Sequence, residues 1–127
     1  MSKSVCFDFD HTLSKEHVQE YAVELISRGV DVWVLTSRYD ELHKHLYTFN
    51  PTNEDLYTVV DKIGIPRHKV MFTNMNWKAE YLAGTHVTWL LDDNPEELIQ
   101  IRNSKIKTVG IQVNSGSWKN KCERLLK

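Results

Sequence analysis

The chain has 127 residues, of which 41% are hydrophobic and 26% are charged. These values are ordinary for a globular protein, and the length fits one domain, residues 1–127, that can bury a core of its own. No run approaches the roughly 20 apolar residues of a membrane-spanning helix, so we expect no membrane association. The N-terminus lacks a signal peptide's apolar core, and Cys6 and Cys122 have no metal-ligand spacing. We therefore expect a cytoplasmic protein with reduced thiols.

Charge is distributed unevenly along the chain, although the net charge is only −1. The segment from Arg102 to Lys127 contains seven basic residues and one acidic residue, so it carries +6 and the rest carries −7. Such a segment is commonly the solvated face of a helix. The alternative is that it guides an anionic substrate toward an acidic site that contains a metal.

Short apolar runs alternate with helical stripes of apolar residues, and Gly or Pro stands at many of the breaks. We expect Asn53 to cap a helix, Gly29 and Gly64 to end helices, and Pro95 to lie in a first turn. In chain order, the pattern predicts strands over 4–9, 31–36, 69–73, 86–91 and 107–113, and helices over 15–28, 39–49, 53–63, 77–83, 95–102 and 118–126.

Strands that alternate with helices predict an α/β protein in which a parallel sheet is covered by helices on both faces, a Rossmann-like three-layer sandwich. Right-handed crossovers restrict how such strands can be ordered. If the first and fourth strands are neighbours, the winding direction reverses between them, and ligands bind at such a switch point.

Two pairs of aspartates follow directly on apolar runs. Asp8 and Asp10 come at the end of the first predicted strand, and Asp92 and Asp93 follow the fourth. Crowded carboxylates repel one another unless a cation or a shared proton lies between them. Because carboxylate oxygens suit a hard cation, the two pairs predict a Mg²⁺ site.

Four motifs in this order resemble those of the haloacid dehalogenase-like superfamily of phosphatases and phosphotransferases. The first is Asp8-Phe9-Asp10-His11-Thr12, which resembles DxDxT, and the second is the strand end Val34-Leu35-Thr36-Ser37-Arg38. The third is a lone lysine at a helix start, Lys78, and the fourth is the acidic strand end Leu90-Leu91-Asp92-Asp93-Asn94-Pro95. The resemblance implies a five-stranded parallel sheet of order 5-4-1-2-3 with its site at the switch point.

The resemblance also implies a phosphoaspartyl mechanism. Asp8 would be the nucleophile, and Asp10 would protonate the leaving group and then deprotonate the attacking water. An extended segment would place both side chains on the same side. The groups implied to contact the phosphoryl group are Thr36, Ser37, Lys78 and Phe9. Mg²⁺ would be held by Asp8, Asp92 and the backbone carbonyl of Asp10, with Asp93 supporting the metal site.

Plainer roles remain open for several of these residues. Thr36 could simply end a strand, Lys78 could be a solvated lysine, and Asp93 could cap the helix that begins at Pro95. The family often has glycine where this chain has His11, and glycine accepts a positive φ more readily. The structure decides between several of these possibilities.

The sequence leaves no room for a cap domain, and the turn between Asp10 and Lys15 is short. An open site needs another lid, which a homo-oligomer, another partner or a large substrate could supply. The leading hypothesis is a Mg²⁺-dependent phosphomonoesterase acting on a phosphorylated small molecule, nucleic-acid end or protein. The alternatives are a phosphotransferase and a binding or regulatory module without turnover.

Overall fold

A parallel sheet of five strands is the centre of the computed structural model, which describes residues 2–43 and 52–127. The sheet order is β3-β2-β1-β4-β5, and every neighbouring pair is parallel. This confirms the expected order, read from the opposite edge. The strands are β1 (Ser4–Phe7), β2 (Asp31–Thr36), β3 (Val70–Phe72), β4 (Val87–Asp92) and β5 (Val109–Gln112).

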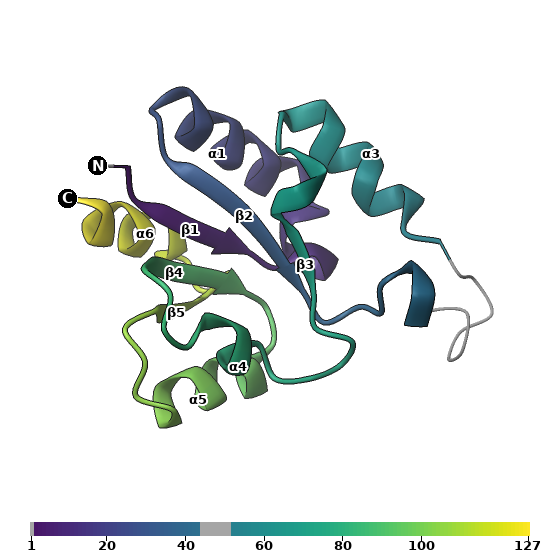
Figure 1. The fold of residues 1–127 in the computed structure, drawn as a ribbon. Coiled ribbons are helices and arrows are strands. Elements are labelled where there is room, and N and C mark those ends of the chain that lie inside the picture. Colours follow the sequence, from purple (N-terminus) through teal and green to yellow (C-terminus); the bar gives the residue numbers. More distant parts are fainter. Residues whose placement is uncertain (1, 44–51) are drawn as a thin grey trace.

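Helices cover both faces of the sheet, as Figure 1 shows. Among the residues that the structure describes, three helices pack on one face and two on the other, which confirms the three-layer arrangement. The first set is α1 (Glu16–Ser27), α3 (Glu54–Ile63) and α6 (Trp118–Leu126). The second set is α4 (Lys78–Leu82) and α5 (Pro95–Asn103), and two short turns, η1 (Phe9–Leu13) and η2 (Arg67–Lys69), complete the described elements.

Alternating side chains of the strands divide the core in two, because successive residues of a strand point to opposite faces. Phe7 and Leu91 lie in the larger cluster under α1, α3 and α6. Cys6 and Leu90 lie in the smaller cluster under α4 and α5. The adjacent strands β1 and β4 are therefore apolar on each face, as expected for a parallel sheet that is covered on both sides.

The predicted element boundaries are mostly right to within two residues, and one difference affects the site. The first strand does not continue to Phe9 but ends at Phe7, and the chain turns at once into η1. Asp10 therefore does not lie on an extended strand, contrary to expectation. Of the helix predicted over 39–49, residues 41–43 are helical and residues 44–49 lie outside the described part.

The described residues form no separate cap. Residues 9–27 between β1 and β2 are taken up by η1 and α1, and those described between β2 and α4 contain α3, η2 and β3. Over residues 2–43 and 52–127, no helix combines the length and the apolar character needed to cross a membrane.

Trp89 is the largest fully buried side chain and should contribute strongly to stability. Its ring lies 5.4 Å from that of Phe7 and 6.4 Å from that of Tyr21, and its indole N–H donates to the carbonyl of Cys122. We predict that Trp89→Ala lowers the free energy of unfolding by about 3–5 kcal/mol in urea titrations, because it leaves a large cavity. Trp77, which is 41% exposed, is the control.

Trp77→Ala should lower the free energy of unfolding by less than about 1 kcal/mol, because Trp77 lies at the surface and its removal leaves no closed cavity. Equal losses for the two variants would contradict the position assigned to Trp89 in the core.

Candidate active site

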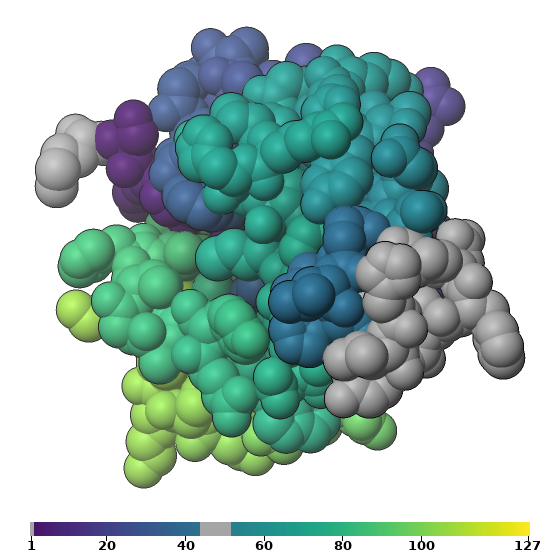
Figure 2. Space-filling view, turned by 45° about the vertical axis from the view of Figure 1, so that its right-hand side comes forward, coloured from purple at the N-terminus to yellow at the C-terminus, as the bar shows by residue number. Residues whose placement is uncertain are grey.

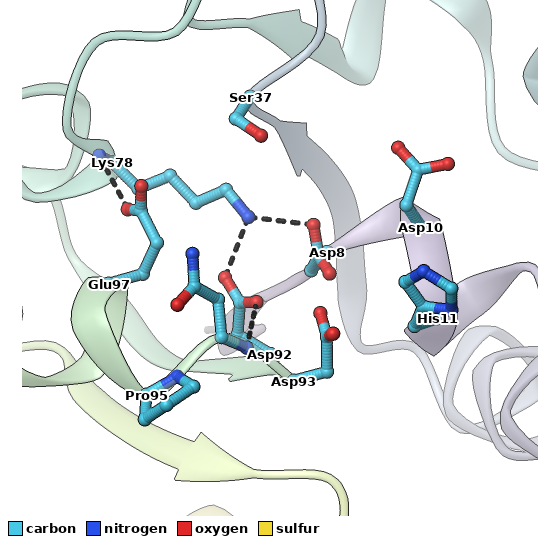
Figure 3. Close-up of a pocket in the computed structure, with 10 residues that line it drawn as sticks. Asp8, Asp10, His11, Ser37, Lys78, Asp92, Asp93, Pro95 and Glu97 are labelled. Atoms are coloured by element: carbon cyan, nitrogen blue, oxygen red, sulfur yellow. Dashed lines mark hydrogen bonds and ion pairs between the residues drawn. The ribbon is translucent and has the colours of Figure 1, made fainter.

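A pocket of about 270 Å³ opens at the carboxyl end of β1 and β4, where the winding of the sheet reverses. Open α/β sheets bind ligands at this place. Figure 3 shows its side chains. They are Asp8, Asp10, His11, Ser37, Lys78, Asp92, Asp93, Asn94, Pro95 and Glu97.

Asp8 is placed by the end of β1 and by the turn that follows it. Its backbone N–H donates to the carbonyl of Leu91, so β1 and β4 remain paired up to the site. The carbonyl of Asp8 accepts from the N–H of Leu13, which closes η1. The hydroxyl of Thr12 in this turn donates to Asp8 Oδ2 at 3.2 Å. The turn therefore orients the carboxylate of Asp8.

His11 has a left-handed backbone, with φ of 61°. This explains why glycine suits the position in the family that the motif resembles. Histidine is among the non-glycine residues that adopt this conformation more often than most. His11 therefore accommodates the turn and places an imidazole in the lining of the pocket.

Lys78 joins the two acidic strand ends. Its ammonium group lies 2.7 Å from Asp8 Oδ1 and 2.6 Å from Asp92 Oδ2, and its side chain is 1% exposed. Its backbone N–H donates to Glu97 Oε2, which ties the start of α4 to α5. Lys78 is therefore a buried member of the site and not a solvated lysine.

Three carboxylates converge where Lys78 supplies one positive charge. Oxygen atoms of Asp8, Asp92 and Asp93 all lie within 4.8 Å of one another. If all four groups are ionised, the cluster carries two negative charges in a largely buried place. A divalent cation would balance this charge, and three carboxylates are suitable ligands for one.

Burial and charge act together on the ionisation of these groups. Burial raises the pKa of Asp8 far above its ordinary value; Lys78 opposes this shift, and the negative charge of Asp92 adds to it. Burial alone would lower the pKa of Lys78, but Asp8 and Asp92 raise it above its ordinary value. Positive charge close to Asp8, from Lys78 or from a bound cation, favours its ionised form against the effect of burial.

Asp10 lines the pocket but takes a different partner from Asp8. Its carboxylate accepts two hydrogen bonds from Arg38, at 2.7 and 2.9 Å, and its side chain is 47% exposed. In Figure 3 it lies apart from the three converging carboxylates. The expectation that Asp10 lies on the first strand is wrong, because β1 ends at Phe7 and Asp10 lies in η1, but its side chain still lines the same pocket as Asp8.

The expected phosphate-binding residues are placed unequally. Ser37 lines the pocket and lies across it from Asp93 in Figure 3. Thr36 is fully buried, and its hydroxyl accepts from the backbone N–H of Arg38. The side chain of Phe9 lies in the core and not in the pocket lining. Among these three, Ser37 is therefore the side chain available to a ligand.

The structure differs from the cap expected at Asn53 and from the cap left open for Asp93. Asn94, and not Asp93, caps α5, because its side chain accepts from the N–H of Glu96. Asp93 therefore does not cap the helix, and its carboxylate belongs to the cluster with Asp8 and Asp92. Asn53 precedes α3 but makes no side-chain cap bond. Its side chain instead accepts from Arg38 and donates to the carbonyl of Tyr39 and to Glu41.

The segment after β2, which contributes Ser37 to the pocket lining, is hydrogen-bonded to the segment after β3. The carbonyls of Ser37 and Arg38 accept from the N–H groups of Met75 and Asn74, respectively, and Asn74 Oδ1 accepts from the N–H of Asp40. Figure 2 shows the two segments side by side on one face, in blue and green. The basic C-terminal segment contributes no residue to the pocket lining.

Sequence reasoning assigned no role to three polar residues that the structure places at the site: Thr12, Arg38 and Glu97. Thr12 and Arg38 lie inside the recognised motifs, so their position in the sequence was a usable signal. Glu97 lies among other polar residues of a helix, where nothing local distinguishes it. Burial raises the pKa of Glu97.

Neither a scan of protein-family models nor a search of curated proteins found a match for this chain. We therefore infer function from the residues of the site.

Lys78 should be essential for the stability of the metal-free protein. We predict that Lys78→Met lowers the free energy of unfolding by about 3–5 kcal/mol in chelator, because it leaves buried carboxylates without their cation. Urea titration measures the change. The control is Lys62→Met, since Lys62 is exposed and donates to the neutral amide of Gln19.

The control should change stability by less than about 1 kcal/mol. If Lys78→Met were as stable as the native protein in chelator, the buried ion pairs would not balance the site as described.

Proposed function

We propose that this protein is a Mg²⁺-dependent phosphomonoesterase that works through a phosphoaspartyl intermediate on Asp8. One observation carries the proposal. A buried lysine bridges Asp8 and Asp92 at the switch point of a parallel sheet, and Asp93 completes a group of carboxylates suited to a cation. The resemblance of the four motifs to the haloacid dehalogenase-like superfamily supports the same conclusion.

Asp8 is the proposed nucleophile. Its carboxylate lines the pocket and is oriented by Lys78 on one oxygen and Thr12 on the other. Attack on phosphorus forms a bond from a carboxylate oxygen to phosphorus and releases the alcohol. The ammonium of Lys78 is placed to offset negative charge on Asp8 and the phosphoryl group, where electrostatic help lowers the barrier.

Asp8, Asp92 and Asp93 are the side chains that would hold Mg²⁺. Bound there, Mg²⁺ would offset the charge of the carboxylates and of the phosphoryl oxygens. The charge balance of the cluster supports a divalent cation, and its oxygen ligands suit Mg²⁺. The contribution expected from the carbonyl of Asp10 belongs to the same proposal.

Asp10 is the proposed group for proton transfer, and Ser37 is the proposed donor to a phosphoryl oxygen. Both line the pocket beside Asp8. A dehalogenase acting on carbon has no need of an acid or base two residues after the nucleophile. The presence of Asp10 therefore favours phosphoryl transfer.

The small volume of the pocket favours a substrate of which little more than the phosphate group enters the pocket. Its volume of about 270 Å³ lies below the range of roughly 300–1,000 Å³ that is usual for small-molecule sites. The described residues form no cap above it. A large phosphorylated substrate, or a second protein chain that covers the site, would exclude the water that an open pocket admits.

Asp8→Asn should abolish phosphate release while preserving the fold, because the amide is a poor nucleophile of nearly the same shape. We predict a loss of at least about 1,000-fold. The assay is phosphate release with Mg²⁺ from an aryl phosphate, sugar phosphates, nucleotides and nucleic acids with 3′- or 5′-phosphate ends. Circular dichroism checks the fold of the variant.

Asp61→Asn is the matched control, because Asp61 is exposed and pairs with Arg67 away from the pocket. It should keep native activity. Full activity of a folded Asp8→Asn protein would refute the nucleophile, and no release from any substrate by the native protein would refute the phosphatase.

Removal of divalent metal should stop the reaction reversibly. Chelation followed by added Mg²⁺ should restore phosphate release, and Mg²⁺ should also raise the melting temperature. At a concentration of 100 Kd, binding adds about 2.7 kcal/mol of stability. Asp92→Asn should lose most of this thermal shift, because Asp92 is a proposed ligand. Full activity in excess chelator would rule out the metal.

A further inference from the structure

Arg38 forms an unusually complete set of hydrogen bonds beside the pocket. Its guanidinium donates to both oxygens of Asp10, to both oxygens of Asp55 and to Asn53 Oδ1. These are five hydrogen bonds, and an arginine side chain has five N–H donors. The guanidinium therefore has one well-defined orientation.

The rest of Arg38 is held equally firmly. Its guanidinium carbon lies 5.0 Å from the centre of the Phe9 ring, and its side chain is 17% exposed. The backbone N–H of Arg38 donates to the hydroxyl of Thr36, and its backbone carbonyl accepts from the backbone N–H of Asn74. Contacts from β2, η1 and the segment after β3 thus converge on one residue.

Anchors on the other side of the guanidinium keep it in place independently of Asp10. Asp55 lies in the first turn of α3, and Asn53 is a buried residue just before that helix. These two contacts would hold Arg38 even while the carboxylate of Asp10 exchanges a proton. A lysine at this position could not make the same contacts, because a single ammonium cannot bind each of two carboxylates through a pair of parallel donors as the planar guanidinium does.

We propose that Arg38 is a positioning residue that holds Asp10 at the place from which it activates water against the phosphoaspartyl intermediate. The proposal rests on the proposed phosphatase function. It gives the α3 segment a part in the reaction, since Asp55 and Asn53 orient Arg38 and Arg38 orients Asp10.

The step that depends on this orientation is the second half-reaction. The water oxygen forms a bond to phosphorus, the bond from phosphorus to the Asp8 oxygen breaks, and the water proton passes to Asp10. Asp8 leaves as a carboxylate and inorganic phosphate is the product. A carboxylate that accepts two hydrogen bonds from arginine still has lone pairs with which to accept that proton.

The first half-reaction offers a comparison within the same protein. The leaving group of 4-nitrophenyl phosphate is weakly basic, so its departure needs no proton from Asp10. A loss of positioning should therefore slow hydrolysis of phospho-Asp8 much more than its formation from this substrate. A general disturbance of the pocket would slow both steps alike.

The experiment is rapid-quench kinetics on Arg38→Gln with 4-nitrophenyl phosphate and Mg²⁺. We expect hydrolysis of the intermediate to slow roughly 100-fold, while its formation slows less than about tenfold. The variant should release a burst of nitrophenol, and intact-protein mass spectrometry should show one added phosphoryl group. Arg38→Lys should show the same pattern, because an ammonium cannot bind Asp10 through two donors.

Arg67→Gln is the matched control. Arg67 also binds both oxygens of an aspartate, Asp61, and lies over a ring, that of Tyr57, but Asp61 does not line the pocket as Asp10 does. It should leave both rates unchanged. Asp55→Asn, which keeps Arg38 and weakens its anchor, should shift the ratio of the two rates in the same direction if Arg38→Gln fails to fold.

The outcomes separate the two proposals. A native protein that releases phosphate, together with a folded Arg38→Gln that slows both steps equally or neither, overturns the role of Arg38 alone. A native protein that forms no phospho-Asp8 from any tested substrate overturns the proposed function, and the role of Arg38 with it.

Discussion

The structure depends on one electrostatic constraint, the burial of several carboxylates around a single lysine at the point where the sheet changes direction. Asp8 and Asp92 come from the adjacent strand ends of β1 and β4, and Lys78 reaches both of them from the first turn of α4. Charges out of contact with water are tolerated only when they are paired and hydrogen-bonded. The site therefore requires the two strands, α4 and the contact of Lys78 with Glu97 on α5 to keep their relative positions.

The same constraint connects stability with chemistry. Lys78 balances part of the negative charge in the absence of a metal, and a divalent cation would balance the rest. A nucleophilic carboxylate in this environment has to be kept ionised by its neighbours, because burial raises the pKa of Asp8. The groups that would make Asp8 reactive are thus the groups that allow it to be buried. Strongly shifted pKa values of this kind are common at active sites.

A second charge network lies beside the first and is built differently. The guanidinium of Arg38 donates hydrogen bonds to Asp10, Asp55 and Asn53, so in this network one cation binds several acceptors near the surface. The two networks place Asp8 and Asp10, two residues apart in the chain, in separate surroundings. Such separation is what a reaction needs when one carboxylate is to attack and the other is to move a proton. The turn after β1, with the left-handed His11, makes the separation possible.

The amino-acid sequence alone predicts the alternation of strands and helices and the strand ends at which Asp8, Asp92 and Asp93 meet, and the resemblance of its four motifs implies the sheet order. These features follow from the local apolar pattern and from motif order, both of which are visible along the chain. The folded structure was needed to establish that β1 stops at Phe7, that Asp10 binds Arg38, that Ser37 and not Thr36 lines the pocket, and that Asn94 caps α5. The cap of α5 is a choice between neighbouring polar residues, whereas the contacts of Arg38 need partners from distant segments, such as α3 and the loop after β3. Hydrophobic periodicity carries no information about such pairings, because they form only after the sheet brings those segments together.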